Sequence, residues 1–179
     1  MSTPIFIDHS VQTAWMDLRE KAERLIAAIE NLSDDQRALT PPKGFNSVET
    51  LIHLGLTDKF ELGLIRKTSG PLDKAPKINF IGKAAMNGMK KPRPMPTMSE
   101  MTPPAGQKPS KEAANQAGRE WMAVLDEITP FVAKCRTTQT MLKHPFFGRF
   151  GPMELAALMT VHLEYHVMRI QEVIPDFRP

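Results

Sequence analysis

Apolar residues recur at three- and four-residue steps through most of this chain, the spacing that places side chains on one face of an α-helix. No run of comparable length shows the two-residue alternation of a β-strand. Capping residues, prolines and glycines indicate where each helical stretch begins and ends. The pattern therefore predicts four long amphipathic helices, over about 11–32, 47–69, 111–132 and 152–173.

The segment 71–109, between the second and third predicted helices, is rich in proline and cannot form one continuous helix. It contains eight of the sixteen prolines. We predict a brief helical segment at 83–89 and an extended, polyproline-like route over 91–107. Residues 70–111 are also basic, with eight lysines and arginines against two acidic side chains. We expect a long basic connector rather than a second domain with its own core.

Four amphipathic helices and one long connector favour an all-α four-helix bundle, with residues 1–179 forming a single domain. Helices joined by short loops lie antiparallel, whereas a connector of about forty residues can cross the whole bundle. The second and third helices would then run parallel to each other. The expected topology is up-down-down-up.

Composition limits the kinds of site that this chain can build. A single cysteine, Cys135, excludes an internal disulfide and every Cys-x-x-Cys site, so metal ligands must be histidine or carboxylate. No apolar run approaches the ~20 residues of a membrane span, and the first residues lack a signal-peptide pattern, so we expect a cytoplasmic protein. Nucleic-acid binding is not expected, because the connector offers one aromatic residue, Phe80, for base stacking.

Three of the five histidines lie where the predicted helices face the core. His162 and His166 are four residues apart on the fourth helix, a spacing that suits two ligands of one metal ion. His53 faces inward from the second helix. Buried imidazoles need partners, and a shared divalent ion is one solution. The alternative is that each is a core histidine with local hydrogen bonds.

The remaining chemistry-bearing residues are predicted to be peripheral. His9 and His144 are expected in loops without a role, and Asp58 and Glu61 on a solvent-exposed face or rim. The His-Glu-x-x-His motif of zinc proteases is missing, so a thermolysin-like peptidase is not expected.

Three pieces of the sequence together resemble the DinB-like superfamily: 46–54 (NSVETLIHL), 144–152 (HPFFGRFGP) and the pair His162-x-x-x-His166. The likeness covers most of the chain, and the Lys-Pro-rich connector resembles that of an uncharacterised subfamily. The resemblance implies an up-down-down-up bundle, often dimeric, that binds zinc, nickel or another divalent ion through His53, His162 and His166. Members include metal-dependent transferases that use low-molecular-weight thiols, maleylpyruvate isomerase-like enzymes and proteins without a known activity.

Three further residues are candidates for a catalytic role. Glu49 lies one turn before His53 and either accepts that ligand's free ring N–H or completes a capping box with Asn46. Arg169 either binds a substrate carboxylate or phosphate, or satisfies carbonyls and pairs with an acid. Tyr165 either donates to a metal-bound species or packs between helices. Many superfamily members carry a histidine where this chain has Tyr165 and a glutamine where it has Arg169.

The predicted histidine site is compatible with two functions. The first is a metal-dependent enzyme, similar to a thiol S-transferase or a hydrolase, with a small-molecule substrate held between the helix ends and the connector. Thiol transfer is preferred by analogy with the superfamily. The second is a non-catalytic bundle that binds a metal ion or a small ligand.

Overall fold

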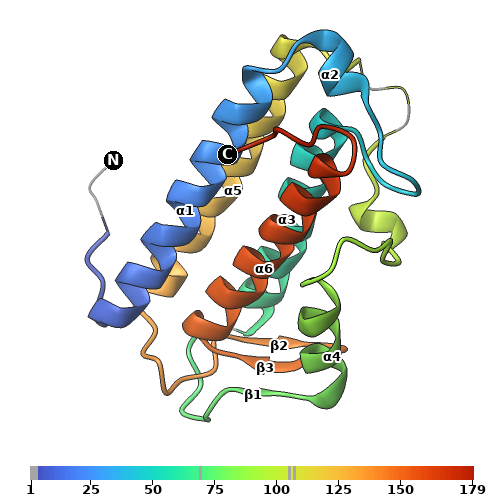
Figure 1. Cartoon of the computed structure of the whole chain (residues 1–179). Helices are drawn as coiled ribbons and strands as arrows, with labels where there is room; N and C mark the ends of the chain where they lie inside the picture. Colours follow the sequence, from blue (N-terminus) through green and yellow to red (C-terminus); the bar gives the residue numbers. More distant parts are fainter. Residues whose placement is uncertain (1–3, 69, 105, 107) are drawn as a thin grey trace.

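The computed structural model describes residues 4–68, 70–104, 106 and 108–179, and over these residues the protein is mostly helical (Figure 1). Its six α-helices there are α1 (His9–Glu30), α2 (Asp34–Ala38), α3 (Ser47–Thr68), α4 (Phe80–Gly88), α5 (Lys111–Ala133) and α6 (Pro152–Gln171). One turn of 3-10 helix, η1 (Ser99–Met101), and three short strands, β1 (Lys77–Ile78), β2 (Leu142–His144) and β3 (Gly148–Phe150), complete the elements. The predicted helical content is confirmed, and the four long helices lie within two residues of their predicted bounds.

Local capping explains where several helices begin. The Ser33 hydroxyl accepts from the Gln36 amide, and the Gln36 side chain accepts from the Ser33 amide, which forms a complete capping box at α2. Ser110 caps α5 in the same way through the Ala113 amide. Pro152 occupies the first turn of α6, where its missing N–H costs nothing. These signals are local in sequence, and the predicted bounds are therefore accurate.

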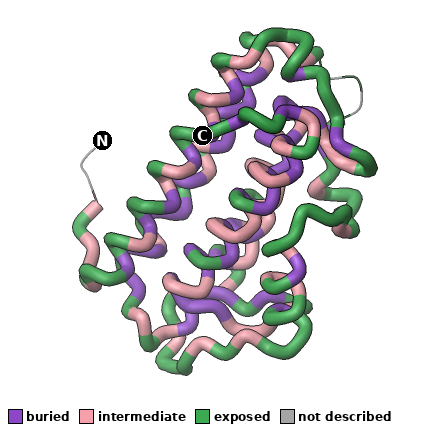
Figure 2. The backbone as a smooth tube through the Cα atoms, in the orientation of Figure 1, coloured by how far each residue is buried: buried purple, intermediate pink, exposed green. Residues whose placement is uncertain are grey.

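The long helices pack side by side around a shared apolar core (Figures 1 and 2). Helix α5 lies against both α1 and α3, and α6 lies against α1 and α3. Two tryptophans fill this core, and each finds a hydrogen-bond acceptor. The Trp15 indole N–H donates to Thr129 at 2.9 Å, and the Trp121 indole N–H donates to the Asp58 carboxylate at 2.6 Å. These bonds join α1 and α3 to α5.

Helix α3 is enclosed by several other elements. It contacts α5, β2, η1 and α6. The prediction that Asp58 and Glu61 lie on a solvated face is therefore wrong, because each side chain is only 3% exposed. A prediction based on one apolar stripe fails for a helix that is enclosed from several directions.

The three short strands form an antiparallel sheet in the order β1-β3-β2, which was not predicted from the sequence. Strands of two or three residues are too short to show a recognisable alternation. β2 and β3 form a hairpin. β1 comes from the connector (71–109) and pairs with β3, where Lys77 lies opposite Arg149. Gly148 has a φ of 102°, and a Cβ there would lie 2.5 Å from the Lys77 carbonyl.

The connector is folded against the long helices rather than extended throughout. Helix α4, which overlaps the predicted helical segment at 83–89, begins three residues earlier and ends at Gly88. It contacts α6, and η1 contacts α3. Figure 1 shows this chain running along one side of α6. No helix of the described ranges is long and apolar enough to cross a bilayer.

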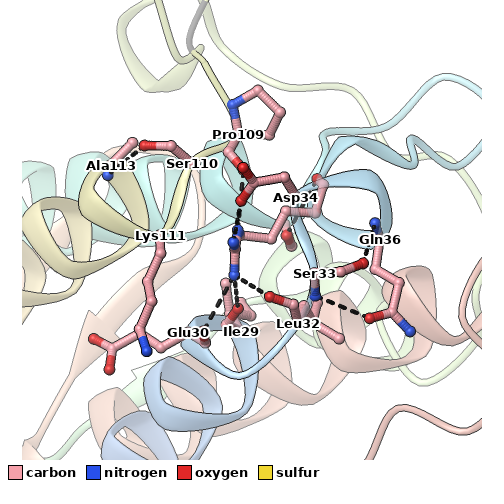
Figure 3. Close-up of polar contacts among 12 residues, drawn as sticks. Ile29, Glu30, Leu32, Ser33, Asp34, Gln36, Pro109, Ser110, Lys111 and Ala113 are labelled. Atoms are coloured by element: carbon pink, nitrogen blue, oxygen red, sulfur yellow. Dashed lines mark hydrogen bonds and ion pairs between the residues drawn. The ribbon is translucent and has the colours of Figure 1, made fainter.

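A buried arginine joins the end of α1 to the start of α5. Arg37, on α2, is 3% exposed and donates to carbonyls of Ile29 and Glu30 at 3.2 and 3.1 Å, and to that of Leu32. It also donates to the Pro109 carbonyl at 3.0 Å and pairs with Asp34 (Figure 3). An arginine near a helix C-terminus satisfies carbonyls that lack an intrahelical partner.

We expect Arg37→Met to lower the free energy of unfolding by about 2–4 kcal/mol, because it leaves several carbonyls and one carboxylate without their donor. Urea denaturation followed by circular dichroism measures this. Arg24→Met is the matched control, since Arg24 forms only an exposed pair with Glu20 and should cost less than about 0.5 kcal/mol. Equal losses in the two variants would contradict a structural role for Arg37.

Candidate metal centre

Three histidines from two helices converge on one point. The Nε2 atom of His162 lies 3.2 Å from that of His53 and 3.1 Å from that of His166. The ligand atoms of all three rings lie within 4.8 Å of one another. His53 comes from α3 and the other two from α6, so the packing of these helices creates the cluster. The structure thus brings together the three residues that were selected from the sequence.

Two of the ligand separations in the cluster match those around a divalent ion, and all the ligand atoms lie within 4.8 Å of one another. Two ligands of a tetrahedral zinc ion with bonds of about 2.05 Å are separated by roughly 3.4 Å. The two measured N–N distances, 3.1 and 3.2 Å, are close to this value. The donor set of three imidazole nitrogens could hold a metal ion and would leave a coordination position open.

A main-chain carbonyl orients the first histidine. The Nδ1 atom of His53 lies 2.7 Å from the carbonyl oxygen of Met101, which can only accept a hydrogen bond. Nδ1 must therefore carry the proton, and Nε2 presents its lone pair to the cluster. This arrangement is the usual support for a metal-binding histidine.

Glu49 does not accept the ring N–H of His53, which is bound by the Met101 carbonyl. Its carboxylate accepts from the Asn46 amide at 3.0 Å, and the Asn46 side chain accepts from the Glu49 amide at 2.9 Å. The structure therefore places Glu49 in the capping box that was the predicted alternative.

Arg169 and Tyr165 line the same cavity as the three histidines, and both bind the main chain of other segments. Arg169 donates to the carbonyls of Pro92 and Pro42 and pairs with Glu172 at 2.9 Å. The Tyr165 hydroxyl donates to the Arg93 carbonyl at 3.0 Å. These bonds correspond to the structural alternatives, in which arginine satisfies carbonyls and tyrosine packs between elements.

Burial keeps the clustered imidazoles in the neutral form that binds metals. It lowers the pKa of His53, and it lowers that of His162 to about 3, with a further contribution from the His53 charge. The pKa of His166 falls well below its ordinary value, first through burial and then through His162.

The histidine cluster opens into a cavity of about 210 Å³. Connector residues, including Met89, Met95 and Met98, form part of its wall. From the sequence, we expect a substrate between the helix ends and this connector. Glu61 and His144 also line the cavity. On α3, Glu61 lies eight residues beyond His53, or roughly 12 Å along the helix axis.

Sequence reasoning missed this second polar pair. His144 was predicted to lie in a loop, but it is the last residue of β2 and is 7% exposed, so that prediction is wrong. The three residues of β2 are too few to be recognised as a strand from the sequence, although in the structure Leu142 and His144 are buried and Lys143 between them is exposed. His9 was also predicted to lie in a loop, but it is the first residue of α1, so that prediction is wrong too. It is exposed and is not among the residues that line the cavity.

Glu61 and Asp58 are buried carboxyl groups with unusual acidity. Burial raises the pKa of Asp58 to about 7, although the Trp121 hydrogen bond opposes this. Burial and the charge of Asp58 raise the pKa of Glu61 to about 8. Burial lowers the pKa of His144 to about 4. Near neutral pH, Glu61 and His144 are therefore both mostly uncharged, and their 3.5 Å contact is not an ion pair.

Comparison of the chain with protein-family models, with curated proteins and with solved structures finds no match. The likeness to the DinB-like superfamily thus stays a prediction from the sequence motifs.

The raised pKa of Glu61 predicts a pH-dependent stability. A carboxyl whose folded pKa exceeds its unfolded value stabilises the fold fully below the unfolded value, near 4.5, and loses that contribution as pH rises through about 8. From pH 5 to pH 9, wild type should lose stability relative to Glu61→Gln, by about 4 kcal/mol. Urea unfolding across this range measures the difference, with the exposed Glu127→Gln as control. Parallel profiles for wild type and Glu61→Gln would contradict the assignment.

Proposed function

We propose that this protein is a divalent-metal-dependent enzyme of the DinB-like type, with zinc or nickel held by His53, His162 and His166. The observation that carries the proposal is the convergence of three neutral imidazole nitrogens at the wall of a cavity. Three protein ligands with an open position are typical of catalytic rather than structural metal sites. When bound, such an ion lowers the pKa of a thiol or water that occupies the open position.

The residues of the chain have defined tasks in this proposal. Met101 holds the His53 ring so that its Nε2 lone pair faces the site. His162 and His166 keep a fixed separation because they lie one turn apart on α6. The connector, with the methionines at its cavity face, excludes water from a small electrophilic substrate and holds it near the metal.

The preferred reaction is transfer of a low-molecular-weight thiol to that electrophile, and hydrolysis is the related alternative. Support for the thiol is chemical: thiolate is a softer ligand than water and suits zinc and nickel. A cavity walled by methionine and phenylalanine side chains suits a mostly apolar substrate.

A second candidate function is a metal- or ligand-binding protein without catalysis. The observation that favours it is that Arg169 and Tyr165 are engaged by main-chain carbonyls, so neither side chain stands free to act on a substrate. Turnover distinguishes the two functions.

We also propose that the four long helices form an up-down-down-up bundle, as in the DinB-like superfamily, and that the protein is a homodimer. The contacts of Arg37 support the topology, because they join the end of α1 to the residue before the cap of α5. A connector that runs from the end of α3 to this point allows α3 and α5 to be parallel. The dimer rests on the resemblance alone.

Metal content tests the proposed ligands. Wild type, dialysed against zinc or nickel and then desalted, should retain about one equivalent of metal per chain by elemental analysis. His53→Ala and His162→Ala should each weaken binding at least about tenfold. His9→Ala is the matched control, since His9 is exposed and lies outside the cluster. Unchanged stoichiometry in both cluster variants would refute the ligand set.

Turnover tests the proposed class. Metal-loaded protein should accelerate the attack of small thiols on an activated aryl halide or an epoxide, and the rate should fall at least about a hundredfold in His162→Ala. Panels of thiols and of esters separate transfer from hydrolysis. Metal retention without turnover in either panel would reject the enzyme and favour the binding protein.

A further inference from the structure

Glu61 is a buried carboxyl group with one oxygen unused. Its side chain is 3% exposed and lines the cavity. Oε1 faces His144, whereas Oε2, among the residues that the structure describes, has no hydrogen-bond partner. Burying a polar atom without a hydrogen-bond partner costs free energy, and folded proteins rarely contain such an atom. An oxygen without a partner in the described chain favours a water molecule or a ligand group at this position.

His144 is fixed so that it supports Glu61 and does not compete for that oxygen. The amides of Phe146 and Phe147 both donate to its Nδ1 atom, each at 3.2 Å. Nδ1 therefore accepts, and the ring proton of the neutral imidazole lies on Nε2, which faces Glu61 Oε1 at 3.5 Å. The Phe147 ring stacks on His144 with centroids 4.2 Å apart and holds it in this orientation.

The charges at the two ends of the cavity differ. Lys43 and Arg169 line it together with the histidine cluster, and Gly44 lies beside Arg169. Near the other end, Asp58 and Glu61 are both buried, and among the described residues neither has a lysine or arginine partner. Burial keeps Glu61 mostly protonated near neutral pH, and a ligand that brings positive charge would favour its ionised form, because the two charges compensate each other.

We propose that Glu61, positioned by His144, binds an amino group of the substrate, roughly two helical turns from the metal centre. The ligand is then an elongated molecule with a metal-binding head, an apolar middle and an ammonium group at the far end. A hydroxyl could also bind a carboxyl group, but it carries no charge that would favour the ionised form of Glu61. Phe146 and Phe147, which also line the cavity, add aromatic surface suited to a cation.

The identity of the ligand as substrate rests on the proposed function, whereas the amine site does not. The first test uses metal-free protein with n-octylamine and n-octanol, which differ only in the head group. By calorimetry, wild type should bind the amine about tenfold or more tightly than the alcohol. Glu61→Gln should bring this ratio close to one. The exposed Glu127→Gln should preserve it.

Two results would overturn the amine site: equal affinities for amine and alcohol in wild type, or an undiminished preference in folded Glu61→Gln. If that variant does not fold, wild-type NMR decides. The His144 ring resonances should shift with n-octylamine and not with n-octanol, and equal shifts would overturn the proposal.

A third probe separates this proposal from the metal centre. Zinc-loaded protein should bind n-octanethiol, and His162→Ala should abolish this while Glu61→Gln leaves it unchanged. An ω-amino-octanethiol should bind more tightly than n-octanethiol, in a manner that depends on Glu61. If thiol binding fails but the amine preference holds, the proposed function is wrong and the amine site stands.

Discussion

The burial of ionisable side chains along α3 is the constraint on which the rest of the structure depends. His53, Asp58 and Glu61 lie on one helix, and each is at most 5% exposed. Each requires a polar neighbour that does not come from α3 itself. Trp121 of α5 serves Asp58, His144 of β2 faces Glu61, and the Met101 carbonyl serves His53. Polar contacts with these buried side chains, in addition to apolar packing, therefore hold the neighbouring elements against α3.

The connector forms one wall of the site and also part of its support. β1 joins it to the hairpin that carries His144, and its carbonyls accept hydrogen bonds from Tyr165 and Arg169 on α6. A rearrangement of this segment would therefore affect both the metal cluster and the carboxyl end of the cavity. Its many prolines reduce the conformational freedom of the unfolded chain and so favour the folded route.

Most of the helices, and half of the candidate site, could be predicted from sequence because the signals are local. Caps and apolar periodicity define α1, α5 and α6, and the four-residue spacing defines the pair His162 and His166. To predict that this pair lies close to His53 also required the assignment of helix faces and the family resemblance. Glu61 was missed because α3 is enclosed on several sides, and His144 because β2 has only three residues. The role of Met101 is a carbonyl contact, for which no residue type is diagnostic.

The bonds that fasten the connector to the site have an evolutionary consequence. His53, Tyr165 and Arg169 are all bound by oxygens of the main chain, at Met101, Arg93 and Pro92, and every amino acid carries that oxygen. Homologues can therefore exchange the side chains at these three connector positions freely, provided that the length and path of the backbone are kept. Among such proteins, insertions and deletions between 92 and 101 should be rarer than substitutions.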